Sequence, residues 1–178
     1  MRAVVCTTFD GIDALSCVDD APEPPMTEGA VRLKVHAAGI NFADTLMCKG
    51  EYQVKPPFPF SPGLEVAGEV LEVAPGVTRV KPGDRVMATV HYGGYASEAV
   101  TDASTVYAIP DNLDFISAAA FPIVYGTSHV GLRDKLKLQA GETLLVHGAA
   151  GGVGLTAVEI AKKMGATVIA TAGGPDKL

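Results

Sequence analysis

Residues 147–154, HGAAGGVG, form a glycine-rich segment that could bring the backbone close to a phosphate. The segment follows the apolar run 143–146 and precedes a run with helical periodicity. Glycines permit close approach, and the first N–H groups of a helix attract anions, so the pattern predicts a pyrophosphate turn. Its spacing is Ala149-x-Gly151-x-x-Gly154, with alanine in place of the first glycine of the fingerprint. We expect the cofactor-binding residues of this turn to be Ala150, Gly151, Gly152, Val153 and Gly154.

The alternative for this turn is a strand–helix connection whose glycines serve only close packing. The choice of nucleotide depends on the next strand, expected at 167–172, which ends without an acidic residue. NAD-binding units place an acid there to bind the ribose 2′-OH. Here Asp176 comes later, beside Lys177. We therefore predict NADP(H), with Lys177 binding the 2′-phosphate. The alternative is that Lys177 is an ordinary surface lysine.

The composition bounds the class of protein. The chain has 178 residues, of which 48% are hydrophobic and 19% charged, as expected of a globular protein. A net charge of −6 argues against a general nucleic-acid or membrane-surface binder. The first ten residues predict a strand rather than a signal peptide, and no apolar run approaches the ~20 residues that span a bilayer. The expected location is cytoplasmic.

The cysteines and histidines predict neither a disulfide framework nor a metal site. Cys6, Cys17 and Cys48 are scattered and odd in number, which suits a reducing compartment. The four histidines are far apart, and no CxxC or HxxxH occurs.

The elements that must position these residues fall into two groups. Residues 1–110 contain short β-like runs separated by Pro and Gly, which predicts a mostly antiparallel β domain, interrupted by a helical patch at 41–50. Later residues alternate helix, buried strand, helix and buried strand, which is typical of a parallel sheet. We predict an α/β protein with domains at 1–121 and 122–178.

Five segments in order resemble one family. They are GINFADTL (39–46), SPGLEVAGEV (61–70), VKPGDRV (80–86), GGYASEAV (93–100) and HGAAGGVG. Together they resemble the medium-chain dehydrogenase/reductase superfamily, and within it the zinc-free quinone oxidoreductases of the zeta-crystallin type. The resemblance implies a GroES-like β-barrel domain followed by the first βαβ part of a Rossmann fold, with the active site in the cleft between the two.

The zinc-binding members of the superfamily hold catalytic zinc through a cysteine and a histidine. At the matching positions this chain has Asn41 and Leu64, and neither is a thiolate or imidazole ligand. Asp44 and Glu65 are present, but we expect them to form hydrogen bonds in a helix or turn. The resemblance therefore implies that hydrogen bonds rather than a metal polarise the substrate carbonyl.

Two side chains are candidates for that polarisation. Asn41 and Tyr52 match positions that line the nicotinamide and substrate in the resembled family, so Asn41 is also a cofactor-binding candidate. The alternatives are that Asn41 satisfies local backbone and that Tyr52 is a packed loop aromatic. A further tyrosine common in the family is Leu46 here, which leaves the substrate open.

The resemblance also places Gly126 and Thr127 beside the cofactor. Their types suit contact with nicotinamide or phosphate. The alternative is that Thr127 caps the N-terminus of a helix beginning at SHVGLRD.

The resemblance implies hydride transfer from NADPH to a quinone or an α,β-unsaturated carbonyl, and a small-molecule partner. Alternatives are an enoyl-thioester reductase of the same superfamily and a non-catalytic remnant that pairs through open strands. Family members are about twice as long, so the chain resembles a truncated member whose isolated activity is open. A homodimer is a further expectation.

Overall fold

A computed structural model of the chain describes residues 1–177. The chain divides into two compact units, Met1–Pro122 and Ile123–Leu178. The first ends one residue beyond the boundary expected from the sequence, and residue 178 lies outside the described part. Each unit is described by itself below.

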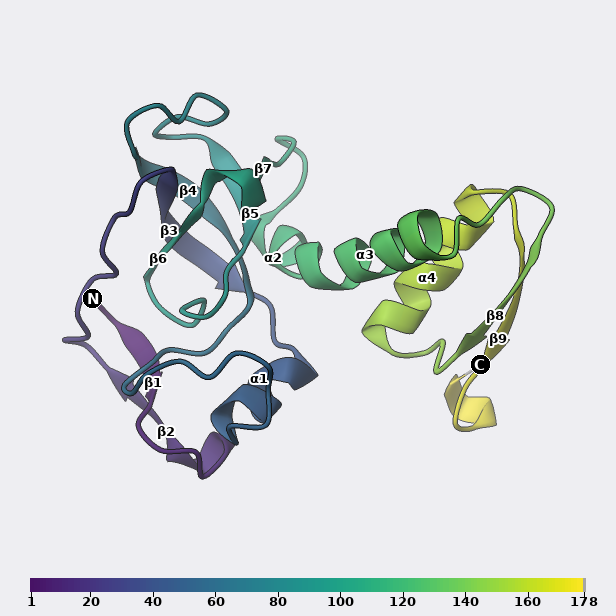
Figure 1. Cartoon of the computed structure of the whole chain (residues 1–178), viewed down its shortest axis with the longest axis horizontal. Helices are drawn as coiled ribbons and strands as arrows, with labels where there is room; N and C mark the ends of the chain where they lie inside the picture. Colours follow the sequence, from purple (N-terminus) through teal and green to yellow (C-terminus); the bar gives the residue numbers. More distant parts are fainter. Residues whose placement is uncertain (178) are drawn as a thin grey trace. The chain divides into compact units, whose positions relative to one another are not determined.

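The first unit is built on a five-stranded antiparallel sheet in the order β6-β3-β4-β5-β7 (Figure 1). Strand β5 alternates buried and half-buried residues, whereas the first four residues of β4 are all buried, because the core lies on one face of the sheet and Ala118 and Ala119 pack on the other. The strands are β3 (Ala30–Ala38), β4 (Glu65–Val73), β5 (Arg85–Thr89), β6 (Glu98–Asp102) and β7 (Val106–Ala108). The core of the sheet includes Val31, Leu33, Val66, Val70, Val86, Ala88, Ala99 and Val106.

A separate antiparallel pair lies near the N-terminus. It joins β1 (Ala3–Cys6) to β2 (Leu15–Val18), with the short 3₁₀ helix η1 (Ile12–Ala14) between them. Single bridges tie Ala3 to Ala96 and Cys6 to Phe60. Strand β2 was not among the predicted strands, because LSCV is short and lacks apolar alternation.

Three short helical elements complete the first unit. They are α1 (Phe42–Cys48), η2 (Ala103–Thr105) and α2 (Phe115–Ala119). The carboxylate of Asp114 accepts the backbone N–H of Ser117 at 2.8 Å and caps α2. Ala118 and Ala119 pack with Ala67 and Ile109, so α2 covers part of the sheet.

The second unit contains a strand–helix–strand arrangement with parallel strands. Strands β8 (Thr143–His147) and β9 (Thr167–Thr171) pair in parallel, and α4 (Gly152–Lys163) connects them (Figure 1). Before them come α3 (Pro122–His129) and the π-helix η3 (Val130–Lys135), and after them the 3₁₀ helix η4 (Pro175–Lys177). Among the described residues, no helix has the length and apolarity to cross a membrane.

The strands of this unit are less buried than the sequence analysis expected. Leu144 and Val168 pack against α4, but the other face carries Leu145 and Ile169, which are 51% and 53% exposed. The continuous apolar runs predicted buried strands. That prediction is wrong for this chain because helix packing covers one face of the two-stranded sheet.

A close backbone contact accompanies an irregularity in the pairing of the main sheet. The pairing of β3 with β4 shifts register between Val35 and Ala37. Gly68 of β4 lies so close to β3 that an added Cβ would overlap the carbonyl oxygen of Lys34. Glycine at this position is therefore a steric requirement of the bulge.

We predict that Gly68→Ala lowers the free energy of unfolding by about 3 kcal/mol, because the new methyl group must displace strand backbone. Gly76→Ala is the comparison: Gly76 has φ +86° but nothing within 4 Å of an added Cβ. It should cost only the left-handed backbone penalty of about 1 kcal/mol. Urea unfolding followed by circular dichroism measures both, and equal midpoints would contradict the close contact.

Candidate functional site

Asn41 sits at the N-terminus of α1 in an extended conformation, φ −122° and ψ 150°. Its backbone N–H donates to Oδ2 of Asp44 at 2.7 Å. This is the reciprocal half of a capping box, and it places a carboxylate in the first turn of the helix. Asp44 is 4% exposed, so the expected role of this carboxylate in helix hydrogen bonding is confirmed.

The side chain of Asn41 is held by a second carboxylate. Its Nδ2 donates to Oε1 of Glu65 at 2.8 Å. Glu65 opens strand β4 and is 2% exposed, whereas Asn41 is half-buried. The amide nitrogen of Asn41 thus bonds across the fold to Glu65, while the capping box also pairs its side chain with the backbone of the first helical turn.

Tyr95 is the third member of this cluster. Its hydroxyl donates to Oδ2 of Asp44 at 2.6 Å. Burial raises the pKa of Tyr95 well above its usual range, and the hydrogen bond to the Asp44 carboxylate adds to the shift. The other carboxylate oxygen of Asp44, Oδ1, is buried and has no hydrogen-bond partner among the described residues. Because its pKa is raised in this way, Tyr95 keeps its proton and can donate to Asp44.

Two glycines make room for the cluster. An added Cβ at Gly39 would overlap the carboxyl group of Glu65. At Gly63, where φ is +97°, it would lie 2.7 Å from Cδ1 of Tyr95. Gly39 of GINFADTL therefore leaves room for the carboxyl group of Glu65, and Gly63 of SPGLEVAGEV leaves room for the ring of Tyr95.

The other candidates of the first unit lie outside this cluster. Tyr52 is half-buried in the loop after α1 and is not among the hydrogen-bond partners of Asn41. Leu46 is half-buried within α1. Sequence reasoning missed Tyr95, although the segment GGYASEAV contained it.

The residues at the positions that the resemblance matches to zinc ligands are Asn41 and Leu64. Leu64 is 6% exposed and packs in the interior at the position where a histidine would be needed. Burial raises the pKa of the Cys48 thiol to about 11, so it is a poor thiolate donor. Within residues 1–177, no three side chains of His, Cys, Asp or Glu are grouped as metal ligands.

The glycine turn of the second unit connects β8 to α4. Gly148 has φ +65°, and the N–H of Gly151 donates to the carbonyl of Gly148 at 3.0 Å. An added Cβ at Gly154 would overlap that same carbonyl oxygen and lie 2.8 Å from Cα of Ala149. The absence of a side chain at Gly154 therefore lets the first turn of α4 pack on the loop.

This packing leaves the N-terminus of α4 open. Ala150, Gly151, Gly152 and Val153 are exposed, and no side chain of the described chain caps the helix. The first backbone N–H groups of a helix lack intrahelical acceptors, so they face solvent here. Exposed donors at the positive end of a 12-residue helix fit a pyrophosphate group.

Helix α3 packs against the start of α4 through buried hydroxyls. Ser128 donates to the carbonyl of Val153 at 2.7 Å, and Thr156 donates to that of Val124 at 3.0 Å. Gly126 and Thr127 lie on the same helix and are exposed. The alternative that Thr127 caps a helix is wrong, because α3 already begins at Pro122.

The loop after β9 carries the expected nucleotide-selecting residues. Strand β9 ends at Thr171, whose hydroxyl lies 2.9 Å from Nδ1 of the exposed His147. Lys177 is exposed in η4. The carboxyl of Asp176 folds back over Gly174, where its Oδ1 would lie 2.5 Å from an added Cβ.

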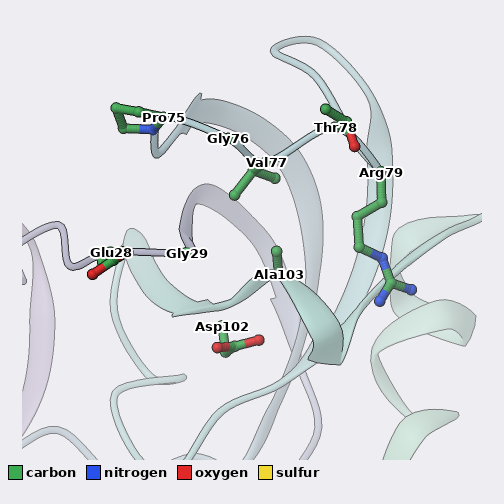
Figure 2. A pocket seen from close by; sticks show the side chains of 9 residues that line it. All are labelled: Glu28, Gly29, Pro75, Gly76, Val77, Thr78, Arg79, Asp102 and Ala103. Carbon is green, nitrogen blue, oxygen red and sulfur yellow. The ribbon is translucent and has the colours of Figure 1, made fainter.

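A cavity of about 510 Å³ in the first unit lies among turns and contains none of the candidate residues (Figure 2). It is open and formed by short loop segments, and we assign it no role. Its lining residues are Glu28, Gly29, Pro75, Gly76, Val77, Thr78, Arg79, Asp102 and Ala103.

We predict that Tyr95→Phe lowers the free energy of unfolding by about 1–3 kcal/mol, because buried Asp44 loses a donor. Tyr92→Phe is the control, since Tyr92 is 42% exposed. A tyrosine whose folded pKa is raised stabilises the fold below its unfolded pKa and loses that contribution as pH rises. The difference in the free energy of unfolding between wild type and Tyr95→Phe should therefore stay constant from pH ~7 to ~9 and become smaller above pH ~10. Urea unfolding across this range is the measurement, and a gap that widens with pH would contradict the assignment.

Comparisons with known proteins find a family match and relatives along this chain. Residues 27–111 match the alcohol dehydrogenase GroES-like domain. The chain is 42% identical to quinone oxidoreductase-like protein 2 of Rattus norvegicus, over 99% of this chain and 50% of that protein.

Two solved structures are similar along the whole chain. The quinone oxidoreductase of Thermus thermophilus, also solved with NADPH, has a TM-score of 0.86 and 38% identity, over 100% of this chain and 55% of that one. The CurK enoyl reductase has a TM-score of 0.88 and 32% identity, over 99% of this chain and 55% of that one. The chain thus spans about half the length of the relatives it matches. Along that half, the chain carries a GroES-like domain, and its relatives and structural neighbours are quinone oxidoreductases of the medium-chain dehydrogenase/reductase superfamily.

Proposed function

We propose that the chain carries the machinery of an NADPH-dependent oxidoreductase that transfers a hydride to a quinone or an α,β-unsaturated carbonyl without zinc. The observation that carries this proposal is the open N-terminus of α4 behind a glycine turn. Similarity to a quinone oxidoreductase that was solved with NADPH supports it.

The second unit would hold the cofactor. The backbone N–H groups at Gly152, Val153 and Gly154 would bind the pyrophosphate, as helix N-termini do. Lys177 would bind the 2′-phosphate, and the exposed pair Gly126 and Thr127 would lie beside the cofactor. NADPH, when bound, supplies the hydride from C4 of its nicotinamide.

The first unit would polarise the substrate. Asn41 uses one Nδ2–H for Glu65, and its second N–H remains for a developing oxyanion. Tyr52 would donate its phenolic proton. Ile40 and Phe42 flank Asn41 and are 88% and 77% exposed, which suits an apolar ring or enone. Because Leu64 replaces a zinc ligand, these hydrogen bonds take the place of a Lewis acid.

A second candidate is an enoyl-thioester reductase, which the similarity to CurK supports. Both reactions place a hydride on carbon and negative charge on a carbonyl oxygen, so the same donors would serve both. A panel of a quinone, a simple enone and an enoyl thioester separates them by kcat/KM.

We expect excess NADPH to raise the melting temperature of this chain. A ligand at ~100 times its Kd adds ~2.7 kcal/mol to the folded state. Gly154→Ala should abolish the shift, because the new Cβ would meet the carbonyl of Gly148. Gly173→Ala is the matched control, with nothing within 4 Å of an added Cβ. A shift that survives in Gly154→Ala would remove the turn from the cofactor site.

The same assay tests the nucleotide preference. Lys177→Ala should reduce the shift with NADPH and leave that with NADH unchanged, because only NADPH has a 2′-phosphate. If neither nucleotide shifts the wild type, the non-catalytic alternative is favoured for this chain.

Asn41→Ala and Tyr52→Phe should each lower kcat/KM by ~100-fold in an NADPH-oxidation assay with the best carbonyl substrate, because each removes a donor to the transition state. Tyr92→Phe is the control for loss of a phenol outside the proposed site. Unchanged turnover in both site variants would rule out these roles.

A further inference from the structure

The side chain of Asn41 is hydrogen-bonded to the carboxyl group of Glu65, which is buried, and this contact carries a role of its own. We propose that Glu65 is a positioning residue that fixes the orientation of the Asn41 side-chain amide. The inference rests on the proposed function for its use in turnover, whereas the contact itself can be tested separately.

The chemistry of the two groups allows a single orientation. An ionised carboxylate only accepts hydrogen bonds, whereas an amide donates from its nitrogen and accepts at its oxygen. With Nδ2 of Asn41 at 2.8 Å from Oε1 of Glu65, a flipped amide would bring two oxygens together. Glu65 therefore selects which end of the amide faces it, and so the direction of the remaining N–H.

Glu65 itself has little freedom to move. It is 2% exposed and pairs in register with Thr89 of β5. Its backbone carbonyl accepts the N–H of Gly39 at 3.1 Å, and its carboxyl group lies where a side chain on Gly39 would be. The carboxylate is therefore fixed by the sheet.

Asn41 is also held from the other side. Asp44 accepts its backbone N–H at 2.7 Å, and Tyr95 donates to the same Asp44 oxygen at 2.6 Å. One carboxylate thus fixes the backbone of Asn41 and another fixes its side chain. A donor that is oriented before substrate binds needs no reorganisation during the reaction, which is how such donors stabilise an oxyanion.

Glu65→Gln tests the inference. Glutamine keeps the volume and one acceptor, but its NH₂ also accommodates the flipped amide of Asn41, so the orientation is no longer selected. The matched control is Glu69→Gln on the same strand, whose carboxylate is partly exposed and lies 3.7 Å from Nε2 of His36. Both variants are first checked for a cooperative melt.

The first readout is independent of activity. Side-chain amide signals of Asn41, assigned by their loss in Asn41→Asp, should show one proton that is shifted downfield and exchanges slowly. In Glu65→Gln that proton should move upfield and exchange faster, and in Glu69→Gln it should stay. If Glu65→Gln leaves both amide protons unchanged, the inference is wrong.

The second readout is kinetic. Glu65→Gln should lower kcat by ~10-fold, as expected for loss of an orienting partner, without changing the KM for NADPH. When Asn41 is already replaced by alanine, Glu65→Gln should not lower kcat any further. An equal loss in both backgrounds would make Glu65 merely structural and overturn the role.

A second variant is used if Glu65→Gln does not fold. If Glu65→Gln does not melt cooperatively, Glu65→Asp replaces it, since it keeps the charge but shortens the reach to Asn41. If the wild type oxidises no NADPH with any substrate, the proposed function fails, and the amide signals alone decide whether Glu65 orients Asn41.

Discussion

The burial of two carboxylates, Asp44 and Glu65, is the constraint on which the first unit's candidate site depends. A carboxylate removed from water must be given hydrogen-bond donors, or it becomes costly. Here the donors are the backbone and side chain of Asn41 and the hydroxyl of Tyr95. These hydrogen bonds tie the start of α1 to β4 and to the loop before β6, and they leave Asn41 with a defined orientation.

The second unit meets a different requirement with backbone alone. Its glycine turn brings the start of α4 against the carbonyl of Gly148 and leaves the first N–H groups of the helix exposed. Buried hydroxyls on Ser128 and Thr156 then hold α3 against α4. The two units therefore present different kinds of hydrogen-bond donor. One presents a side-chain donor fixed by buried charge, and the other presents backbone donors at a helix terminus.

Much of the fold could be predicted from local pattern. The expected β-rich first part, the helix after Asn41 and the parallel strand pair all occur in the structure. Strand β2 was missed because its four residues show no alternation, and the burial of β8 and β9 was overestimated. Burial depends on what covers a strand, which apolar sequence alone does not specify.

The sequence by itself indicated the β-rich first part, the later strand–helix–strand order and the position of the glycine turn, because periodicity and glycine spacing are local properties. The GroES-like class followed from the resemblance to a family. Only the tertiary structure decided what Asn41 does with its amide and why Tyr95 matters. Asn41 and Glu65 are 24 positions apart, and Tyr95 and Asp44 are 51 apart. Such partners are chosen by the pairing and packing of strands, since a buried charge accepts whichever donor the fold brings within reach.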